Sequence, residues 1–293
     1  MGKAPIQLNT NINTGSVYGG QVTTASTSIL EPEVLPYVDG YFKGLILKNK
    51  NYYLNPFYSN RIFADYYYRS LGIKDTQQVT PLYIKKKSDL SKIKLLWNYS
   101  LGGSFGLKGK YFNLRQKFLP FPPLYKIKFT PPSKDRLVDI NCRMSTNNGR
   151  NSISYHRQKT TNILKEKFKL NVQAIPLNQY YKELKKTKIA LSPFGWGEIN
   201  YRDFEVISAG AALMKPSMEH IETWPDLYIK DKTYISYSWD FIDLEEKLNI
   251  FLQKGNYEQI ARNAQSYYGK YLSTKEGYKE FIQRVKNIFL HEQ

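Results

Sequence analysis

A cation and a carboxylate, Arg202 and Glu205, lie three residues apart near the middle of the chain. The sequence predicts a helix from about Asn200 to Ala209 with Gly210 at its C-cap, which places both side chains on one face. Arg202 then lies in the first turn, where the helix dipole opposes a cation. A bound diphosphate gives a reason for that cation, with Glu205 accepting hydrogen bonds from ribose hydroxyls. The alternative is a surface pair worth roughly 0.2–0.5 kcal/mol.

A glycine-containing loop precedes this helix and must position it. Residues 189–191 are apolar and predict a strand, after which Gly195 and Gly197 flank Trp196. Glycines between a strand and a helix let backbone N–H groups approach a ligand closely, and the helix N-terminus adds a partial positive charge. A second apolar strand is predicted for 211–216. The unit therefore suits an anionic ligand, most often phosphate.

Neighbouring side chains extend this predicted anion site. Arg157 opens a predicted helix over 154–168, from which it can reach a phosphate across the sheet edge from Arg202; the alternative is a solvated arginine. Lys215 follows the second strand, and both a phosphate contact and a surface position remain open. The full predicted set of ligand-binding residues is Gly195, Trp196, Gly197, Glu198, Tyr201, Arg202, Glu205, Arg157 and Lys215.

The segment over 189–216, IALSPFGWGEINYRDFEVISAGAALMKP, resembles the donor-binding half of GT-B-fold glycosyltransferases. Its R-x-x-E-x-x-x-x-G pattern is also similar to exostosin-like and CAP10-like glycosyltransferases, and the residues after it resemble bacterial group 1-like donor-binding domains. The resemblance covers about 137–272 and is strongest at 188–228. It implies that Arg202 faces the donor diphosphate and Glu205 the ribose. Many GT-B enzymes carry two glutamates eight positions apart, whereas Glu198 and Glu205 are seven apart.

The second half of the chain alternates predicted strands and helices. The strands are expected at 137–144, 172–176, 188–191 and 211–216, and the helices at 154–168, 178–187 and 200–209. This alternation predicts a Rossmann-like parallel sheet with helices on both faces. Ligands of such sheets bind beyond the carboxyl ends of the strands. The predicted fold class is α/β and GT-B-like, with a smaller N-terminal α/β unit.

Three regions are predicted along the chain. Residues 1–30 read as a tail or irregular arm, 31–132 as an acceptor-side unit, and 133–293 as a nucleotide-sugar donor-binding domain with C-terminal helices. In the acceptor-side unit we expect strands at 41–47, 51–54 and 94–99 and a helix at 61–71 ending at Gly72. The C-terminal helices over 243–289 should be broken near Gly255, Ser273 and Gly277.

Composition limits the class of protein. The 293 residues are 41% hydrophobic and 15% aromatic, which is enough to form a core and excludes a disordered protein. Cys142 is the single cysteine, so the chain has no internal disulfide framework and no cysteine-based metal site. No run approaches 18 apolar residues, and the N-terminus lacks the apolar region of a secretory signal. We therefore expect a cytoplasmic protein, with peripheral membrane contact left open.

Positive charge is concentrated in the first half. The formal net charge is +18, and residues 1–130 carry 18 Lys and Arg against six Asp and Glu. The segment 90–134 holds nine basic residues and no acidic one. Such a block implies an anionic partner: a membrane surface, a charged glycan, a phosphate-bearing donor or a nucleic acid. The alternative is a solvated basic face.

The catalytic base is sought in the acceptor-side unit. Inverting transfer needs a carboxylate or a histidine to deprotonate the acceptor hydroxyl, whereas a retaining enzyme does not. Asp39 lies in a turn-like setting among aromatic residues, and Asp65 lies on the predicted 61–71 helix among tyrosines, which suits a sugar platform. A cap or turn role is the alternative for each.

Metal chemistry has no sequence signal. The chain lacks Asp-x-Asp, His-Glu-x-x-His and paired cysteines, so no metal and no cofactor other than the nucleotide-sugar substrate is expected. Positive side chains and a helix dipole would stabilise the leaving diphosphate instead. The sequence predicts a metal-independent glycosyltransferase, a hexosyl- or pentosyltransferase, acting on a glycan, lipid-linked or protein acceptor. The alternatives are a basic nucleic-acid-binding protein, which the ligand-loop motif disfavours, and a non-catalytic glycan-binding relative.

Overall fold

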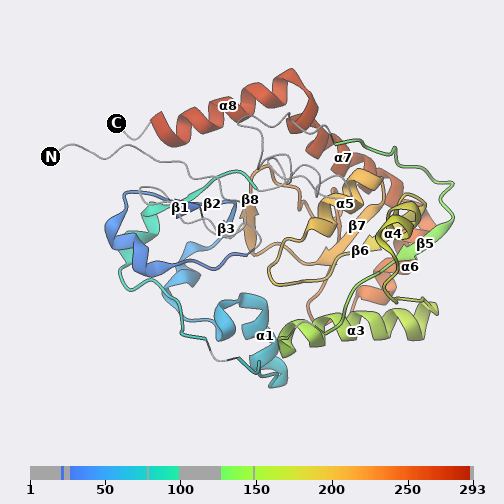
Figure 1. The fold of residues 1–293 in the computed structure, drawn as a ribbon, viewed down its shortest axis with the longest axis horizontal. Coiled ribbons are helices and arrows are strands. Elements are labelled where there is room, and N and C mark those ends of the chain that lie inside the picture. The colour runs from blue at the N-terminus through green and yellow to red at the C-terminus, as the bar shows by residue number, and fades with distance from the viewer. Residues whose placement is uncertain (1–20, 23–26, 78, 99–126, 148, 291–293) are drawn as a thin grey trace.

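The computed structural model describes residues 21–22, 27–77, 79–98, 127–147 and 149–290 (Figure 1). The strands are β1 (Gln21–Val22), β2 (Tyr41–Lys43), β3 (Leu45–Leu47), β4 (Ile93–Leu95), β5 (Val138–Asn141), β6 (Thr187–Leu191), β7 (Ala212–Pro216), β8 (Ile221–Thr223) and β9 (Ile235–Tyr237). The α-helices are α1 (Ile62–Leu71), α3 (Asn151–Phe168), α4 (Leu177–Leu184), α5 (Tyr201–Ala209), α6 (Leu244–Lys254), α7 (Tyr257–Ser273) and α8 (Lys275–Leu290). Short 3-10 helices lie at Pro32–Tyr37, Lys50–Leu54, Tyr58–Asn60 and Lys87–Lys92.

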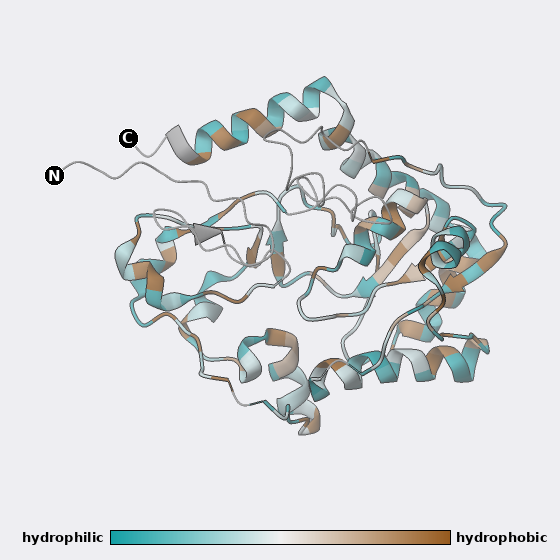
Figure 2. Ribbon diagram, in the orientation of Figure 1, coloured by the Kyte–Doolittle hydropathy of each residue, from teal (hydrophilic) through white to brown (hydrophobic). Residues whose placement is uncertain are grey.

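A parallel sheet of order β5-β6-β7-β9 forms the centre of the C-terminal half. Its register pairs Ile189 with Ala212 and Met214 with Ile235. Most positions of β6 and every position of β7 are buried, as expected for parallel strands covered on both faces. In Figure 2 these strands are among the more hydrophobic parts of the fold, while the outer helix surfaces are largely hydrophilic. The predicted α/β class with a C-terminal parallel sheet is confirmed.

Helices cover this sheet on its two faces, with α3 on one side and α7 on the other (Figure 1). Helix α7 buries Ile260, Ala261, Ala264 and Tyr268, the i, i+3 and i+4 spacing of one helix face. Helix α8 then runs back toward the N-terminal half. The helix ends expected near Gly255 and Ser273 are confirmed. The break expected near Gly277 is wrong, because that residue lies inside α8.

The N-terminal half forms a smaller unit around a parallel sheet of order β1-β2-β4. Strand β3 leaves this sheet and pairs antiparallel with β8, so the two halves share a two-stranded sheet. The structure describes only the end of the segment over 1–30, for which the sequence predicts a tail or irregular arm. Strand β1 pairs with β2, and Thr27, Ser28 and Leu30 are buried in the protein.

Two predicted strands are not strands in the described part of the chain. Residues 50–54 form a 3-10 helix because the Asn49 side chain accepts the Asn51 N–H at 3.1 Å and caps the turn. Residues 172–176 pair with no neighbouring strand, since β5 bonds only to β6 and Pro176 serves as the N-cap of α4. Isolated propensity cannot supply the missing partner strand.

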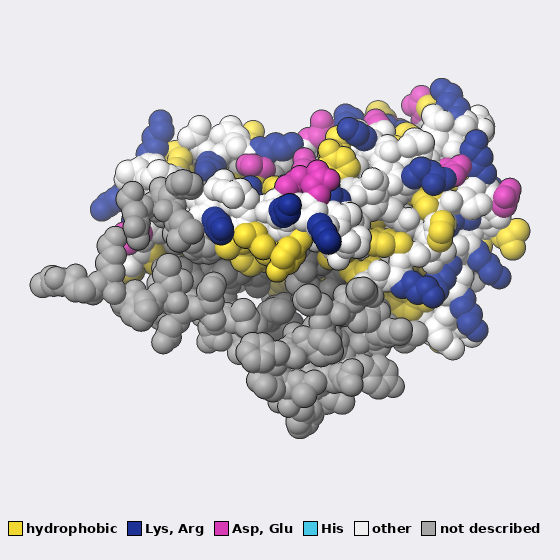
Figure 3. Space-filling view, turned by 90° about the horizontal axis from the view of Figure 1, so that it is seen from above, with side chains coloured by type: hydrophobic (Ala, Val, Ile, Leu, Met, Phe, Trp, Pro, Cys, Tyr) yellow, Lys and Arg dark blue, Asp and Glu magenta, His cyan; other side chains and the backbone are white. Residues whose placement is uncertain are grey.

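Two sequence expectations concern membranes and the basic block. None of the helices that the structure describes is long and apolar enough to cross a membrane. Most of the basic segment 90–134 lies outside the described residues. On the face that carries α8, Lys and Arg side chains are interspersed with Asp and Glu among the described residues (Figure 3).

A buried arginine fixes the amino-terminal edge of the central sheet. Arg136 donates from Nη1 to the Thr187 carbonyl at 2.9 Å and from Nη2 to the Ala209 carbonyl at 2.9 Å. Ala209 ends α5, and a cation is stabilising at the negative end of a helix dipole. The next residue, Gly210, has a φ of 74° and passes close to the same guanidinium.

We predict that Gly210→Ala destabilises the protein by about 2–4 kcal/mol, from left-handed strain plus overpacking. A Cβ at this position would lie 2.3 Å from the Thr130 carbonyl oxygen and 2.5 Å from Arg136 Nη2. Gly72 is the matched control, because its φ is 67° and a Cβ there meets nothing within 4 Å. Gly72→Ala should cost only about 1–2 kcal/mol. Urea unfolding midpoints measure both losses, and equal losses would contradict the packing argument.

A buried histidine joins α1 to α3. The Tyr67 hydroxyl lies 2.5 Å from Nδ1 of His156 and 3.0 Å from the Trp239 carbonyl oxygen. Burial lowers the pKa of His156 well below its ordinary value, and the charges of Lys215 and Arg157 lower it further. The imidazole is therefore neutral in the folded protein.

This depressed pKa predicts a loss of stability in mild acid. Below about pH 6.5 the unfolded chain binds a proton at His156 that the folded protein does not bind. The free energy of unfolding therefore decreases as the pH is lowered. Stability is full above that pH and falls by up to about 1.4 kcal/mol per pH unit until the folded pKa is reached. Chemical denaturation between pH 7 and pH 5 should show a shallower slope for His156→Asn. The same slope in both proteins would remove His156 as the cause.

Candidate functional site

The loop between β6 and α5, residues 192–200, lies at the carboxyl edge of the central sheet, and we call it the Gly195 loop. A Cβ on Gly195 would lie 2.5 Å from Asn200 Oδ1 and 2.9 Å from Arg157 Nη2. A side chain at this position would displace Asn200 and Arg157, both of which approach the loop backbone closely. Gly197 accepts the Gly195 N–H at 3.1 Å, which closes the loop.

Helix α5 begins at Tyr201 through a capping box formed by Asn200 and Asp203. The Asn200 side chain also donates to the Pro193 carbonyl at 2.8 Å, which ties the helix start to the loop start. Gly210 ends the helix in the left-handed conformation. The predicted helix is confirmed to within one residue at its start.

The Asp203 carboxylate is buried at the base of this loop. It accepts hydrogen bonds from the Ser192 hydroxyl at 2.5 Å and the Tyr228 hydroxyl at 2.7 Å, and it pairs with Lys215 Nζ at 3.2 Å. Lys215 also donates to the Ser192 carbonyl at 3.1 Å. Burial lowers the pKa of Lys215, and the Asp203 charge opposes that change. The structure thus places Lys215 inside the protein with a carboxylate partner, not at the open edge where a phosphate contact was expected.

Three arginines gather near the end of β5, and we call Arg143, Arg157 and Arg202 the arginine cluster. All three lower the pKa of the neighbouring Cys142 thiol, although burial is the larger effect and raises it to about 12. Burial and then the Arg202 charge lower the pKa of Arg157. The structure therefore brings together two arginines from the sequence prediction, on α3 and α5, and adds a third from the β5 end.

The members of the arginine cluster differ in how they are held. Arg143 is paired with Glu183, from Nη2 to Oε2 at 2.8 Å. Arg157 donates from Nε to the Phe194 carbonyl and from Nη1 to the Ser145 carbonyl, both at 3.0 Å. Arg202 is partly exposed, lies over the Tyr180 ring at 5.1 Å and reaches Asn141 Oδ1 at 3.4 Å.

Among the described residues, Arg202 has no carboxylate within ion-pair distance, so the surface pair with Glu205 does not form. Glu205 instead accepts hydrogen bonds from the Tyr180 hydroxyl at 3.1 Å and the Tyr181 hydroxyl at 2.5 Å. Burial raises the pKa of both tyrosines, and the Glu205 charge raises it further. They remain donors, and the carboxylate keeps lone pairs for further hydrogen bonds. The charge of Arg202 is left for an anion.

Glu198 lies away from the open edge. It is fully buried and accepts from the Ser28 N–H at 3.1 Å and the Ser28 hydroxyl at 2.6 Å. His220 Nε2 lies 3.9 Å from its Oε1. Burial raises the pKa of Glu198, but His220 and Ser28 together bring it below its ordinary value. Glu198 thus joins the N-terminal segment to the Gly195 loop. Two other predicted site residues, Trp196 and Tyr201, are 55% and 49% exposed.

The two candidate bases occupy different environments. Asp65 is buried; its Oδ1 accepts the Tyr58 N–H at 2.9 Å and its Oδ2 pairs with Arg69 at 2.6 Å. These contacts are those of the cap or turn alternative. Asp39 is exposed on a bend before β2. A base role for either residue remains a prediction.

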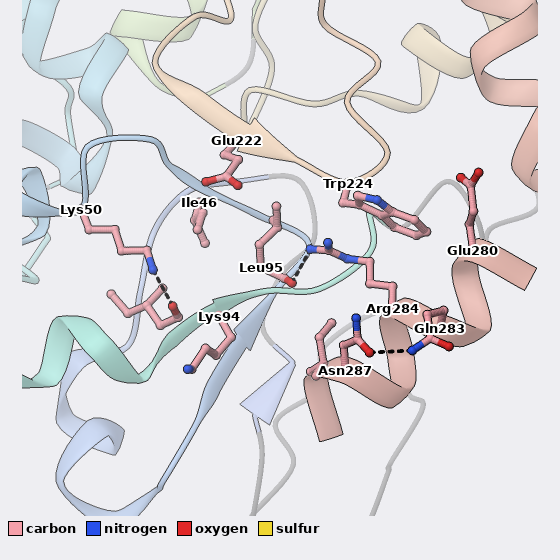
Figure 4. Close-up of a pocket in the computed structure, with 12 residues that line it drawn as sticks. Ile46, Lys50, Lys94, Leu95, Glu222, Trp224, Glu280, Gln283, Arg284 and Asn287 are labelled. Carbon is pink, nitrogen blue, oxygen red and sulfur yellow. Dashed lines mark hydrogen bonds between the residues drawn. The ribbon is translucent and has the colours of Figure 1, made fainter. Parts of the chain in front are cut away.

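A separate cavity lies away from these residues. It has a volume of about 710 Å³ and lies between β4, β8 and α8. Figure 4 shows Arg284 reaching from α8 past Trp224 toward β4, where Nη2 donates to the Leu95 carbonyl at 2.8 Å. None of the predicted site residues is among the described residues that line it. We place the candidate site at the arginine cluster, because its charge and its convergent hydrogen-bond donors indicate an anionic ligand. The volume of the cavity alone does not indicate which kind of ligand it would hold.

A metal centre is not formed by the described residues, in which no three His, Cys, Asp or Glu side chains gather where they could hold an ion. Sequence reasoning missed several residues near the site: Arg61, Arg143, Arg150, Tyr180 and Tyr181. A signal existed for Arg61 and Arg150, since each directly precedes a helix and a cation is unfavourable there. The tyrosines gave none, because a Tyr-Tyr pair on a helix is most often packing.

Comparisons with known proteins gave matches among solved structures alone: no family model and no curated protein matches the chain. TarM matches at 11% identity and a TM-score of 0.38, over 72% of this chain and 48% of that one. Anabaena HepE in complex with UDP-glucose matches at 9% identity and a TM-score of 0.37, over 68% of this chain and 58% of that one. Sucrose-phosphate synthase from Thermosynechococcus elongatus matches at 8% identity and a TM-score of 0.40, over 89% of this chain and 61% of that one.

These solved structures are GT-B glycosyltransferases, the fold to which the sequence shows a resemblance. The match spans about half to three fifths of their length. At TM-scores of 0.37 to 0.40 the superpositions are partial, and nothing about the ligand of this chain follows from them.

We predict that Asp203→Asn destabilises the protein by about 3–5 kcal/mol, because it leaves the Lys215 charge buried without a partner. The matched control is Asp139→Asn, which breaks an exposed pair with Lys188. That variant should lose no more than about 1 kcal/mol. Urea denaturation measures both. A loss at Asp203 as small as that at Asp139 would show that the buried pair does not hold the loop.

Proposed function

We propose that this chain is a glycosyltransferase of GT-B-like architecture that binds a nucleotide-sugar at the carboxyl edge of its central sheet. The observation that carries the proposal is the convergence of Arg157 and Arg202 beside the Gly195 loop, with Arg202 lacking a carboxylate partner among the described residues. Two like charges held together repel each other unless an anion joins them. A diphosphate at the start of α5 fits both the charges and the helix dipole.

Glu205 supports the nucleoside part of the proposal. Its carboxylate lies one turn along α5 from Arg202 and is fixed by two tyrosine hydroxyls. A carboxylate so fixed is an oriented acceptor for vicinal hydroxyls such as those of a ribose. Its distance along the helix from Arg202 matches the order diphosphate, then ribose.

The chemistry that follows is displacement of a nucleoside diphosphate. The acceptor hydroxyl oxygen attacks the anomeric carbon, and its proton passes to a base or to the departing diphosphate. The bond from that carbon to the diphosphate oxygen breaks, and the diphosphate oxygen keeps the electron pair. Arg202 and Arg157 stabilise the negative charge that develops on this oxygen, so no metal is required. The acceptor in this proposal is a glycan, a lipid-linked molecule or a protein.

We predict that Arg202→Ala weakens binding of the nucleoside diphosphate by about 10- to 150-fold, the loss expected for a hydrogen bond to a charged group. The wild-type protein is first screened by thermal shift against UDP, GDP, CMP, dTDP and their sugars. Affinity for the ligand that stabilises it most is then measured by calorimetry in both proteins. The free nucleoside should bind both equally, because it carries no diphosphate.

The control for this variant is Arg262→Ala, which removes an exposed arginine paired with Glu258 on α7. It should leave nucleotide affinity unchanged. Glu205→Gln should weaken the nucleoside and the nucleoside diphosphate by similar factors, since the ribose is common to both. Unchanged affinity in Arg202→Ala, or no nucleotide binding by the wild type, would reject the donor site.

A further inference from the structure

Trp196 projects from the Gly195 loop with two arginines over its ring. The guanidinium carbons of Arg61 and Arg150 lie 4.9 Å and 4.7 Å from the ring centroid. Arg61 also donates from Nε to the Trp196 carbonyl at 2.8 Å. The indole is 55% exposed, so this cluster opens to solvent on the ring side. We call Arg61, Arg150 and Trp196 the tryptophan cluster.

Both arginines occupy helix N-caps. Arg61 is the N-cap of α1 and Arg150 that of α3, and neither makes a side-chain capping hydrogen bond. Asp, Asn, Ser and Thr are the usual residues there, because an acceptor satisfies the free N–H groups and the dipole repels cations. Two N-terminal helix ends and two guanidinium groups therefore add positive potential at one place.

Burial makes this arrangement costly. Arg61 is 4% exposed, and the Arg150 side chain is 7% exposed. Burial and then the Arg150 charge lower the pKa of Arg61 to about 10, while Glu198 and Asp75 oppose that change. Arg61 therefore remains charged at neutral pH. Two buried like charges in contact with one ring need a counterion.

The protein supplies that counterion only in part. Asp75 Oδ2 lies 3.7 Å from Arg150 Nη1, and the same carboxylate accepts from the Ser59 hydroxyl at 2.7 Å and the Ser152 N–H at 2.8 Å. In the part of the chain that the structure describes, Nε and Nη1 of Arg150 are buried and have no hydrogen-bond partner. Buried donors without acceptors are uncommon and indicate a missing acceptor.

We propose that the tryptophan cluster is a second anion site, which binds a phosphate group other than the donor diphosphate. Phosphate offers several oxygens to two guanidinium forks at once, and the half-exposed indole can pack against the organic part of a phosphate ester. The two clusters contact the loop at different places: Arg61 donates to the Trp196 carbonyl and Arg157 to the Phe194 carbonyl.

The ligand class at this site is a phosphate-bearing acceptor. Arg61 comes from the N-terminal half and Arg150 from the C-terminal half, so the bound group lies where the two halves meet beside the donor loop. Assigning the phosphate to the acceptor rests on the proposed glycosyltransferase function, whereas the anion site itself does not.

The test uses inorganic phosphate as the probe on the full chain, at constant ionic strength. Calorimetry measures its affinity for the wild type, Arg61→Gln and Arg150→Gln, with Arg262→Gln as the exposed arginine control. We expect the two cluster variants to weaken phosphate binding by about tenfold or more and the control to leave it unchanged. Arg150→Lys keeps the charge but loses the fork, so it should bind phosphate with intermediate affinity.

A crossed measurement separates this site from the donor site. Arg202→Ala should lose nucleoside diphosphate affinity and keep phosphate affinity, and Arg61→Gln should do the reverse. A measurement on the wild type does not depend on whether a variant folds. Its thermal shift with phosphate and nucleoside diphosphate together should equal the sum of the shifts with each alone. Phosphate that competes with the nucleotide, or that fails to bind the wild type, overturns the second site. Phosphate binding without any nucleotide binding keeps the site and overturns both the donor function and the acceptor assignment.

Discussion

The buried carboxylate of Asp203 is the constraint on which the site depends. One side chain caps α5, accepts from Ser192 at the end of β6 and from Tyr228, and neutralises Lys215 at the end of β7. A carboxylate held by this many partners fixes the start of α5 relative to two strands. Arg202 and Glu205 are oriented only because that helix start is fixed. The interior ion pair thus orients side chains that themselves reach solvent.

Positive charge gathered around the Gly195 loop is the second main feature of the structure. The Gly195 loop has arginines on both sides, Arg157 on its Phe194 carbonyl and Arg61 on its Trp196 carbonyl. Folding brings these like charges together at the loop, and Arg61 lies at the start of α1, where the helix dipole opposes it as well. An anion that binds at this loop relieves the repulsion between the arginines, and this relief contributes to the binding free energy. A donor diphosphate and an acceptor phosphate on the two sides of one loop would give such a compensation.

The sequence by itself determined the local elements of the donor half. Short-range rules predict helix α5, its glycine C-cap and the two apolar strands around it. Capping, helix periodicity and strand burial all depend on residues that are close together in the sequence. The same rules gave α1 with Gly72 and the ends of α6 and α7. They failed for 172–176 and for 51–54, where a strand needs a partner that the local sequence does not name.

Only the tertiary structure decided which partner each charged side chain takes. Lys215 and Arg202 look alike in the sequence as cations near a phosphate loop, yet Lys215 is paired with Asp203 in the core. Arg202 is partly exposed and has no carboxylate partner among the described residues. Glu198 turned toward Ser28, 170 positions away, and the Trp196 ring received Arg61 from the far half of the chain. Pairings of this kind depend on how the two halves pack, since charge interactions act through space and no spacing along the chain encodes them.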